Sequence, residues 1–255
     1  MQMNARSARV SVCMATYNGA AYLAEQIDSV LEQLGPADEL VITDDRSTDE
    51  TVAIIQSYAD PRIVLHRSGR NQGYVRAFED AIGRSSGDVV LLADQDDVWL
   101  PGRVDVMVAA LDRSAVVASN LSLLGSGAPL KSPISGRPWR LRSSTADHRR
   151  RNLARIIAGD APYFGCAMGV RRDALALAVP FPAFLTESHD LWIAIVGNVS
   201  RSMGHVDADT LLRRVHEANA SSPRPRGLAA AVRSRWMLLR AIRVARTRVR
   251  AGHPL

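Results

Sequence analysis

The chain has 255 residues, 47% of them hydrophobic, which is enough to bury one large core. Its two cysteines, Cys13 and Cys166, stand alone in apolar stretches, which argues against a disulfide framework or a zinc site and favours a reducing compartment. The apolar run 10–15 is too short for a signal peptide, and no run approaches the roughly 18 residues of a membrane-spanning helix. We therefore expect a cytoplasmic protein.

The net charge of +6 is unevenly distributed along the chain. Residues 1–130 carry 10 basic and 18 acidic side chains, whereas residues 131–255 carry 22 basic and 8 acidic ones. This asymmetry predicts that the two halves do different work.

The first half alternates between short β-rich runs and helical patterns. Ser47 and Glu50 form a capping-box pattern that predicts a helix running toward Tyr58. Strands are predicted at 10–15, 39–43, 62–66 and 89–93, and further helices at 23–34 and 74–84. Because parallel strands need crossover connections, this alternation predicts an α/β fold with a mostly parallel, doubly wound sheet.

The second half is less regular. Residues 124–148 are rich in Gly, Ser and Pro and predict a long loop, of the kind that often forms a lid or an acceptor-binding segment. The predicted helices lie at 149–158, 172–179 and 189–196, and the predicted strands at 165–171 and 209–217.

Polar loops follow all four strands of the first half. Since ligands bind outside the carboxyl ends of strands in open α/β sheets, these loops should line one crevice. Asp94 and Asp96 form a D-x-D pair after the fourth strand, and paired carboxylates can hold Mg²⁺ or Mn²⁺ together with substrate phosphates. On its own the D-x-D pair is a weak signal, and a solvated turn is the alternative.

The motifs taken together are more specific. The segments "VSVCMATYNGAAYLAEQIDSVLEQ", "ELVITDDRSTDET", "NQGYVRAFEDAI" and "GDVVLLADQDDVWLPGRV" lie in order within residues 9–104. In sequence and spacing they resemble the inverting family 2 glycosyltransferases. This resemblance implies the GT-A fold, which is Rossmann-like, and transfer of a sugar from a nucleotide diphosphate donor.

The resemblance also implies roles for individual residues. Asp45 would hydrogen-bond the base, Arg76 would balance the diphosphate charge, and Asp96 would bind the metal more directly than Asp94. The residues expected to contact the donor are Thr16, Tyr17, Asn18, Asp45, Asn71, Gly73, Arg76, Asp94 and Gln95.

Several neighbouring residues have purely structural alternatives. Ser47 and Asp49 are better explained as helix-capping residues than as ligands, and Asp44 as a turn residue. Gly19 and Gly73 are also explained by backbone freedom alone. Asp97 is equally compatible with capping the loop and with contacting the metal.

A thinner resemblance covers the second half. "YFGCAMGVRRDAL", "PFP", "HDLWIAI" and "RRVHEANAS" are similar to the rhamnosyltransferase-like branch of the family. There the acid matching Asp190 is the catalytic base, with Glu187 as a competitor and His189 either orienting the site or capping a helix. His216 would be a third metal ligand and Arg214 a diphosphate contact, although Glu217 departs from the glycine common in that branch.

The resulting interpretation is one GT-A domain at 1–220, with a nucleotide-sugar-binding half at 1–120 and an acceptor or catalytic half at 121–220. The expected activity is metal-dependent inverting transfer from dTDP-rhamnose or a UDP-sugar to a hydroxyl of a glycan or lipid-linked acceptor in bacterial surface polysaccharide synthesis. A sugar nucleotidyltransferase and a non-catalytic nucleotide-sugar-binding module are the alternatives.

The remaining segment, 221–255, predicts a basic amphipathic helix. Val232, Trp236, Leu239 and Ile242 recur at helical spacing among arginines, and no acidic residue follows Glu217. Such a helix is typical of an inner-leaflet membrane-surface element, so peripheral membrane association is expected. Packing on the domain is the main alternative, and no specific nucleic-acid partner is expected.

Overall fold

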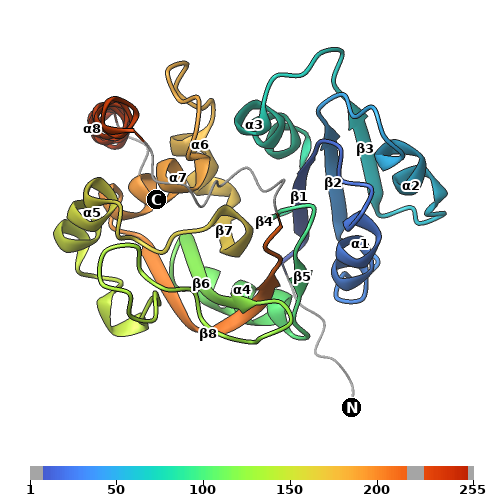
Figure 1. Cartoon of the computed structure of the whole chain (residues 1–255), viewed down its shortest axis with the longest axis horizontal. Coiled ribbons are helices and arrows are strands. Elements are labelled where there is room, and N and C mark those ends of the chain that lie inside the picture. Colours follow the sequence, from blue (N-terminus) through green and yellow to red (C-terminus); the bar gives the residue numbers. More distant parts are fainter. Residues whose placement is uncertain (1–7, 217–226, 252–255) are drawn as a thin grey trace.

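The computed structural model describes residues 8–216 and 227–251 and shows one eight-stranded sheet covered by helices on both faces (Figure 1). Within this part of the chain the strands lie in the order β3-β2-β1-β4-β7-β6-β8-β5. The strands are β1 (Val10–Thr16), β2 (Glu39–Asp44), β3 (Ile63–Arg67), β4 (Val89–Ala93), β5 (Val98–Trp99), β6 (Val116–Leu123), β7 (Met168–Arg171) and β8 (Met203–Arg213).

The helices separate the strands along the chain. They are α1 (Leu23–Leu31), α2 (Thr51–Ser57), α3 (Tyr74–Arg84), α4 (Arg103–Leu111), α5 (Arg149–Ala158), α6 (Arg172–Ala178), α7 (His189–Val199) and α8 (Leu228–Arg250), with short 3₁₀ turns η1 (Ser143–Thr145) and η2 (Gly165–Ala167). None of these helices combines the length and hydropathy needed to cross a bilayer.

The first half of the sheet is parallel, as the strand–helix alternation predicts. β1 pairs in parallel with β2 on one side and β4 on the other, and β2 pairs in parallel with β3. The carboxyl ends of these strands therefore meet at one edge of the sheet. The α/β fold expected from the sequence is confirmed.

The second half makes the sheet mixed. β7 is antiparallel to both β4 and β6, β6 and β8 are parallel, and the two-residue β5 is antiparallel to β8. β5 follows β4 in the chain and pairs with β8. This pairing brings the segment after β4 next to the end of β8, although the two are more than a hundred residues apart in sequence.

The two faces of the sheet bury different helices. Alternate residues of β1 point to opposite sides. Cys13 belongs to a core cluster that includes residues of α3, α5, α6, α7 and α8, whereas Val12 and Met14 belong to a second cluster that includes residues of α1 and α4. Strands buried on both faces explain the near-continuous apolar runs of β1 and β4.

The predicted elements differ from the structure at several places in the later part of the chain. The predicted strand 165–171 is a 3₁₀ turn followed by the shorter β7, and the predicted strand 209–217 starts earlier, at Met203, and ends at Arg213. Residues 214–216 are irregular, and Glu217 lies outside the described residues. β5, β6 and α4 were missed, although "VVASN" has β-rich character and "RVDVMVAAL" has helical spacing.

The capping-box prediction was wrong. α2 begins at Thr51, and Ser47 instead donates its backbone N–H to a carboxylate oxygen of Asp44, at 3.0 Å. Asp49 accepts the N–H of Thr51 at 3.0 Å. Ser47 thus stabilises the loop after β2, and Asp49 the first turn of α2.

One fully buried cation ties several elements together. Arg103, 1% exposed at the start of α4, donates to the Cys166 carbonyl at 2.7 Å and to the Thr210 hydroxyl of β8. Its guanidinium carbon lies 4.5 Å from the centre of the Trp99 ring. Burial lowers the pKa of Arg103 to about 10, which leaves the side chain charged at neutral pH.

Replacing this arginine should therefore destabilise the protein. We expect Arg103→Met to lower the free energy of unfolding by about 2–4 kcal/mol, because the Cys166 carbonyl is left without its charged donor. Urea unfolding followed by circular dichroism measures this change. Arg113→Gln, at an exposed position just beyond α4, is the control and should change stability by less than about 0.5 kcal/mol. Equal stability of the two variants would contradict the structural role of Arg103.

Candidate active site

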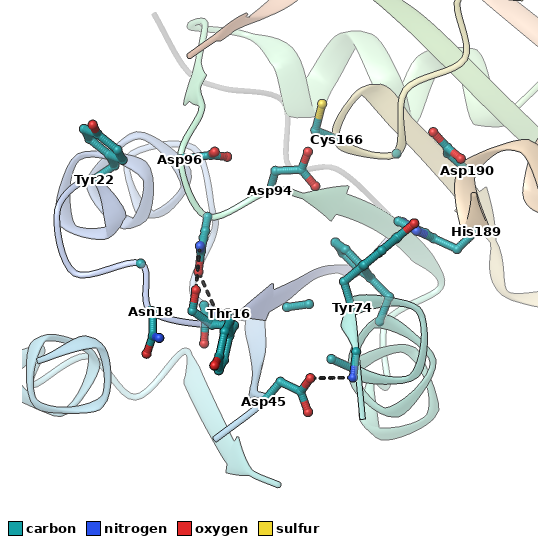
Figure 2. Close-up of a pocket in the computed structure, with 18 of the residues that line it drawn as sticks. Thr16, Asn18, Tyr22, Asp45, Tyr74, Asp94, Asp96, Cys166, His189 and Asp190 are labelled. Carbon is teal, nitrogen blue, oxygen red and sulfur yellow. Dashed lines mark hydrogen bonds between the residues drawn. The ribbon is translucent and has the colours of Figure 1, made fainter. Parts of the chain in front are cut away.

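A cavity of about 1100 Å³ opens at the carboxyl ends of β1, β2 and β4 (Figure 2). Most of the residues predicted to contact the donor line it, namely Thr16, Tyr17, Asn18, Asp45, Asn71, Gly73, Asp94 and Gln95, and so do Asp96, Asp190 and His216. The volume suits a nucleotide-sized ligand with an adjoining smaller one.

The loops after β1 and β2 are joined by hydrogen bonds. The backbone N–H of Asn18 donates to the Ser47 hydroxyl at 2.9 Å, and the Asn18 side-chain oxygen accepts the N–H of Thr48 at 2.8 Å. Asn18 has a φ of 47°, a left-handed conformation that asparagine tolerates better than most residues. Asn18 therefore fixes the shape of this wall of the cavity.

Gln95 fastens the loop after β4 to the loop after β1. Its side-chain oxygen accepts the Tyr17 N–H at 2.9 Å and its side-chain nitrogen donates to the Tyr17 carbonyl at 3.1 Å. A Cβ on Gly19 would lie 2.3 Å from the Gln95 side-chain oxygen, so a larger residue there would displace the Gln95 side chain. Gln95 lines the cavity, but its side-chain amide hydrogen-bonds the backbone of Tyr17.

Asp45 organises the third loop. Its two oxygens accept the backbone N–H groups of Gln72 at 2.8 Å and Gly73 at 2.7 Å. Gly73 has a φ of 81°, which favours glycine in this turn. Each carboxylate oxygen keeps lone-pair capacity for a further donor, so this arrangement remains compatible with a contact to a base.

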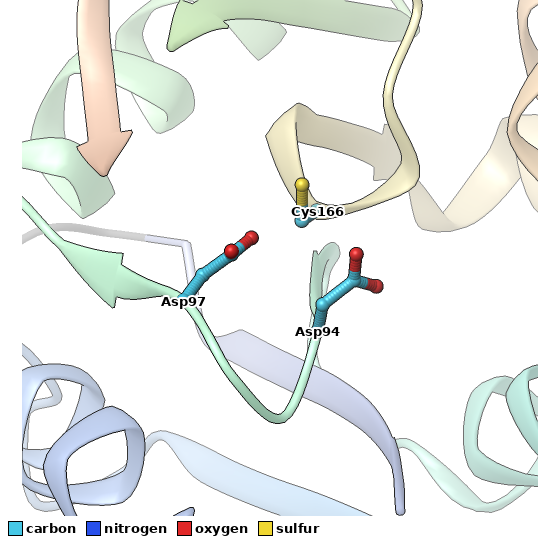
Figure 3. A group of neighbouring side chains, drawn as sticks. All are labelled: Asp94, Asp97 and Cys166. Carbon is cyan, nitrogen blue, oxygen red and sulfur yellow. The ribbon is translucent and has the colours of Figure 1, made fainter. Parts of the chain in front are cut away.

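Negative charge concentrates after β4, whose five residues are all buried. Burial, with Asp97 and Asp96 nearby, raises the pKa of Asp94 to about 8, and burial beside Asp96 raises the pKa of Asp97 to about 6. Asp94, Asp97 and Cys166 each offer a ligand atom within 4.8 Å of the others (Figure 3). The group is short of positive charge.

Asp96 has a different partner. Its carboxylate lies 2.7 Å from His216 Nε2, and the His216 ring lies 4.8 Å from the Tyr22 ring. Both Asp96 and His216 line the cavity, whereas Asp97 is only 1% exposed and accepts the backbone N–H of Arg214. The three predicted metal residues thus line one cavity, but of these three only Asp94 belongs to the close group with Asp97 and Cys166.

The donor set suits a hard divalent cation. Two or three carboxylates and an imidazole are ordinary ligands for Mn²⁺, and carboxylates for Mg²⁺. Burial raises the pKa of the Cys166 thiol well above its usual value, so the thiol keeps its proton and is a poor ligand at neutral pH. These residues fit a magnesium or manganese ion better than zinc.

The arginines differ from the prediction. Arg76 bonds the carbonyls of Phe181 and Pro182, pairs with Glu79 and does not line the cavity. Arg214 donates to the Asp96 carbonyl at 3.0 Å and pairs with Glu25.

Arg213 faces the cavity, with its guanidinium 5.1 Å from the Phe164 ring centre, and was missed. Although burial opposes its charge, the neighbouring acidic groups outweigh this and raise its pKa. Strand alternation along "LLRRV" separates the two arginines, but the sequence could not say which one faced inward.

The start of α7 forms another part of the cavity wall. The Ser188 N–H donates to the Tyr74 hydroxyl at 3.1 Å, and Ser188 has a φ of 62°, which sets the direction of the helix. Asp190 follows in the first turn and faces the cavity that Asp94 and Asp96 also line (Figure 2). Of the two candidate bases, Asp190 is among the described residues that line this cavity, and Glu187 is not.

Two properties of this wall bear on its chemistry. Burial raises the pKa of Asp190 to about 6, so the carboxylate is ionised at neutral pH yet more basic than an exposed aspartate. Burial lowers the pKa of His189 to about 3, and its ring stacks on Phe78 with centres 4.3 Å apart. His189 is therefore a neutral wall residue rather than a cation.

Solved structures share this fold. Residues 1–349 of S. aureus TarS, crystallised with UDP-GlcNAc, superimpose with a TM-score of 0.69 at 20% identity, covering 93% of this chain and 66% of that one. Such a likeness shows the shared fold.

Sequence relatives include the Escherichia coli glucosyltransferase WfgD, whose described activity uses UDP-Glc and a diphosphoundecaprenol-linked GlcNAc acceptor. It is 25% identical over 73% of this chain and 69% of its own length. The succinoglycan biosynthesis protein ExoO of Rhizobium meliloti is 32% identical over 45% of this chain.

The match to ExoO covers 34% of that protein, and the match to the putative glycosyltransferase EpsE of Bacillus subtilis covers 39%, so the chain matches little more than a third of these relatives. The family model of the glycosyl transferases, by contrast, matches residues 11–176, from β1 into α6. This match spans the larger part of the chain and includes the loops that follow β1, β2, β3 and β4. The chain belongs to glycosyl transferase family 2.

Proposed function

We propose that this protein transfers a sugar from a pyrimidine nucleoside diphosphate donor to a hydroxyl of a glycan or lipid-linked saccharide in bacterial surface polysaccharide synthesis, with inversion at the anomeric carbon. One observation carries the proposal: a basic carboxylate, Asp190, lines the same cavity as the acidic residues Asp94 and Asp96 after β4.

The two halves of the chain divide the chemistry. The loops of residues 1–120 form most of the donor site, with Asp45 and Tyr17 near the nucleoside, and Arg213 from the second half lies near the diphosphate. Asp94, Asp96 and His216 would hold the Mn²⁺ or Mg²⁺ ion, which when bound neutralises charge on the departing diphosphate. The rest of residues 121–220, with Asp190, supplies the acceptor side.

Asp190 performs the proton transfer. As the acceptor oxygen attacks the anomeric carbon, its proton passes to the Asp190 carboxylate, and the bond to the diphosphate oxygen breaks with its electron pair leaving on the diphosphate. No covalent bond to the enzyme is needed. The positive N-terminus of α7 helps keep Asp190 ionised before it accepts the proton.

Two related donors fit the proposal, a UDP-sugar and dTDP-rhamnose. UDP is named in both the WfgD activity and the TarS complex, which supports a UDP-sugar for this chain; dTDP-rhamnose shares the pyrimidine diphosphate and is the alternative. A sugar nucleotidyltransferase would need a Gly-rich, basic first loop for a triphosphate, which "TYNGAAYL" lacks. A non-catalytic binding module would have no use for the basic carboxylate Asp190.

Donor binding can be tested without any acceptor. With Mn²⁺ present, UDP or dTDP at about 100 times its Kd should stabilise the protein by about 2.7 kcal/mol, whereas GDP should have little effect. Differential scanning fluorimetry measures the shift. Asp94→Asn should remove its metal-dependent part, and Asp112→Asn, at an exposed site beyond α4, should retain it. Absence of a metal-dependent shift with every nucleotide would refute the donor site.

Asp190 can be tested by transfer itself. Asp190→Asn should lower kcat by roughly 10²–10⁴-fold, because the amide cannot accept the proton, and should leave the thermal shift with UDP unchanged. Glu187→Gln is the matched control and should retain kcat within a few fold. If Glu187→Gln lost transfer while Asp190→Asn kept it, the roles of the two acids would be reversed.

Asp190→Asn should also change how the folding stability of the protein depends on pH. The folded-state pKa of Asp190, about 6, lies above the ordinary value of 3.8, so the folded protein holds this proton longer than the unfolded chain. Relative to Asp190→Asn, the native protein should lose stability as pH rises from about 4 to about 6, by at most about 3 kcal/mol, and no further above that range. Denaturation of both proteins with EDTA present, at pH 5 and pH 8, measures the difference; an unchanged difference would contradict the raised pKa.

A further inference from the structure

α8 has two apolar faces, and only one of them packs on the domain. Met237, Leu238, Ala241 and Ala245 are buried, and the helix lies against α7, α5 and α6 at the margin of the molecule (Figure 1). Arg248 bonds the carbonyls of Leu177 and Ala178. This inner face makes α8 an integral part of the second half of the fold.

The other apolar face is exposed. Val232 is 49% exposed, Trp236 59% and Leu239 40%. Their spacing of four and three residues places them in one stripe on the helix surface. Ile242, which the sequence pattern placed with them, is 7% exposed and belongs to the inner face.

Arginines surround and extend this stripe. Arg243, Arg246 and Arg250 are exposed and continue it toward the end of the helix at helical spacing, and Arg233 and Arg240 flank it. The Arg240 guanidinium lies 4.2 Å from the centre of the Phe184 ring. α8 contains no acidic residue, so every charged side chain on its outward face is positive.

We propose that the outward face of α8 docks on the surface of an anionic lipid bilayer. Tryptophan prefers the headgroup region, and arginines can extend to anionic phosphates while their stems cover apolar surface. Val232 and Leu239 add apolar area beside the ring, and the arginines supply the charge complementarity. The shallow stripe fits a helix lying on a membrane rather than crossing it.

The chemistry disfavours other occupants. A nucleic acid would match the arginines but would leave the aliphatic side chains of Val232 and Leu239 without a role. A second copy of α8 would bring arginines against arginines with no acidic side chain on either helix.

The inference extends the lipid-linked acceptor proposed above, since docking would hold the enzyme where such acceptors lie. Vesicle binding needs neither donor nor transfer, so its failure would leave the proposed reaction standing, and failure of the reaction would leave docking standing.

Co-sedimentation of the full chain with vesicles tests the proposal. Vesicles containing phosphatidylglycerol should bind the protein at least ten times more strongly than pure phosphatidylcholine vesicles, and high salt should weaken binding. Trp236 emission should shift to the blue on binding. Trp236→Phe should abolish this shift, because Trp99 and Trp192 are buried in the core, whereas Trp139→Phe should retain it.

Two sets of variants separate charge from apolar contact. Arg233→Gln, Arg243→Gln and Arg246→Gln together should weaken binding roughly 100-fold, while Arg67→Gln, Arg70→Gln and Arg113→Gln, exposed on other elements, should change it less than about threefold.

Trp236→Ser with Leu239→Ser should weaken binding about tenfold or more, and Ile134→Ser, at a 65% exposed position, should not. Unchanged helix content by circular dichroism shows that each variant is folded.

Several outcomes would overturn the proposal. These are absence of binding, equal binding to neutral and anionic vesicles, or equal loss with the control arginine set. If the protein bound RNA but not vesicles, the outward face of α8 would be assigned to nucleic acid. A concentration-dependent dimer in sedimentation velocity that Trp236→Ser dissolves, without vesicle binding, would assign it to a second copy.

Discussion

The acidic group after β4 constrains the rest of the structure. β4 is buried along its whole length, so the carboxylates of Asp94 and Asp97 enter a region of low dielectric constant where their charges are costly. Arg103 from α4 and Arg213 from the end of β8 bring positive charge near this group, and His216 Nε2 lies 2.7 Å from the Asp96 carboxylate. β5 follows the acidic residues directly and pairs with β8, which places these carboxylates beside the end of that strand. The second half of the sheet thus brings positive charge beside negative charge.

Much of the cavity at the ends of the parallel strands was predictable because it depends on local sequence. Once strands were placed at 10–15, 39–43 and 89–93, parallel pairing alone directed Thr16, Asp45 and Asp94 to one sheet edge, and all three line the cavity. Asp190 was identified through resemblance to a family, since nothing in its local pattern distinguishes a proton acceptor from a helix-start aspartate. Its neighbour Ser188 shows why: the Tyr74 hydroxyl that orients this turn lies 114 residues away.

Where the structure departs from the predicted placement, contacts outside the local pattern are the reason. Arg76 lies in the expected helix, but its guanidinium bonds the carbonyls of Phe181 and Pro182. Arg213 and Arg214 are adjacent and chemically identical, and the end of β8 decides which one lines the cavity. Ser47 fits the capping pattern, yet its hydroxyl accepts the backbone N–H of Asn18, 29 residues away, and its own N–H donates to Asp44. Local propensity is overruled wherever a longer-range partner offers a better hydrogen bond.

α8 shows the same limit in hydrophobic patterning. A period of 3.6 residues predicts an apolar stripe but does not show whether the stripe packs on the domain or faces solvent. The sequence pattern therefore grouped Ile242 with Trp236, although Ile242 is buried and Trp236 is exposed. The packed face needs small residues for close approach, and Ala241 and Ala245 supply them, with exposures of 0% and 1%. The outward face instead carries Trp236 among arginines. A helix selected only to complete the core would gain nothing from a tryptophan in water, because exposed apolar area offers no stability to the folded state. The coexistence of a packed face and an exposed apolar face on α8 is the feature on which the proposed membrane docking rests.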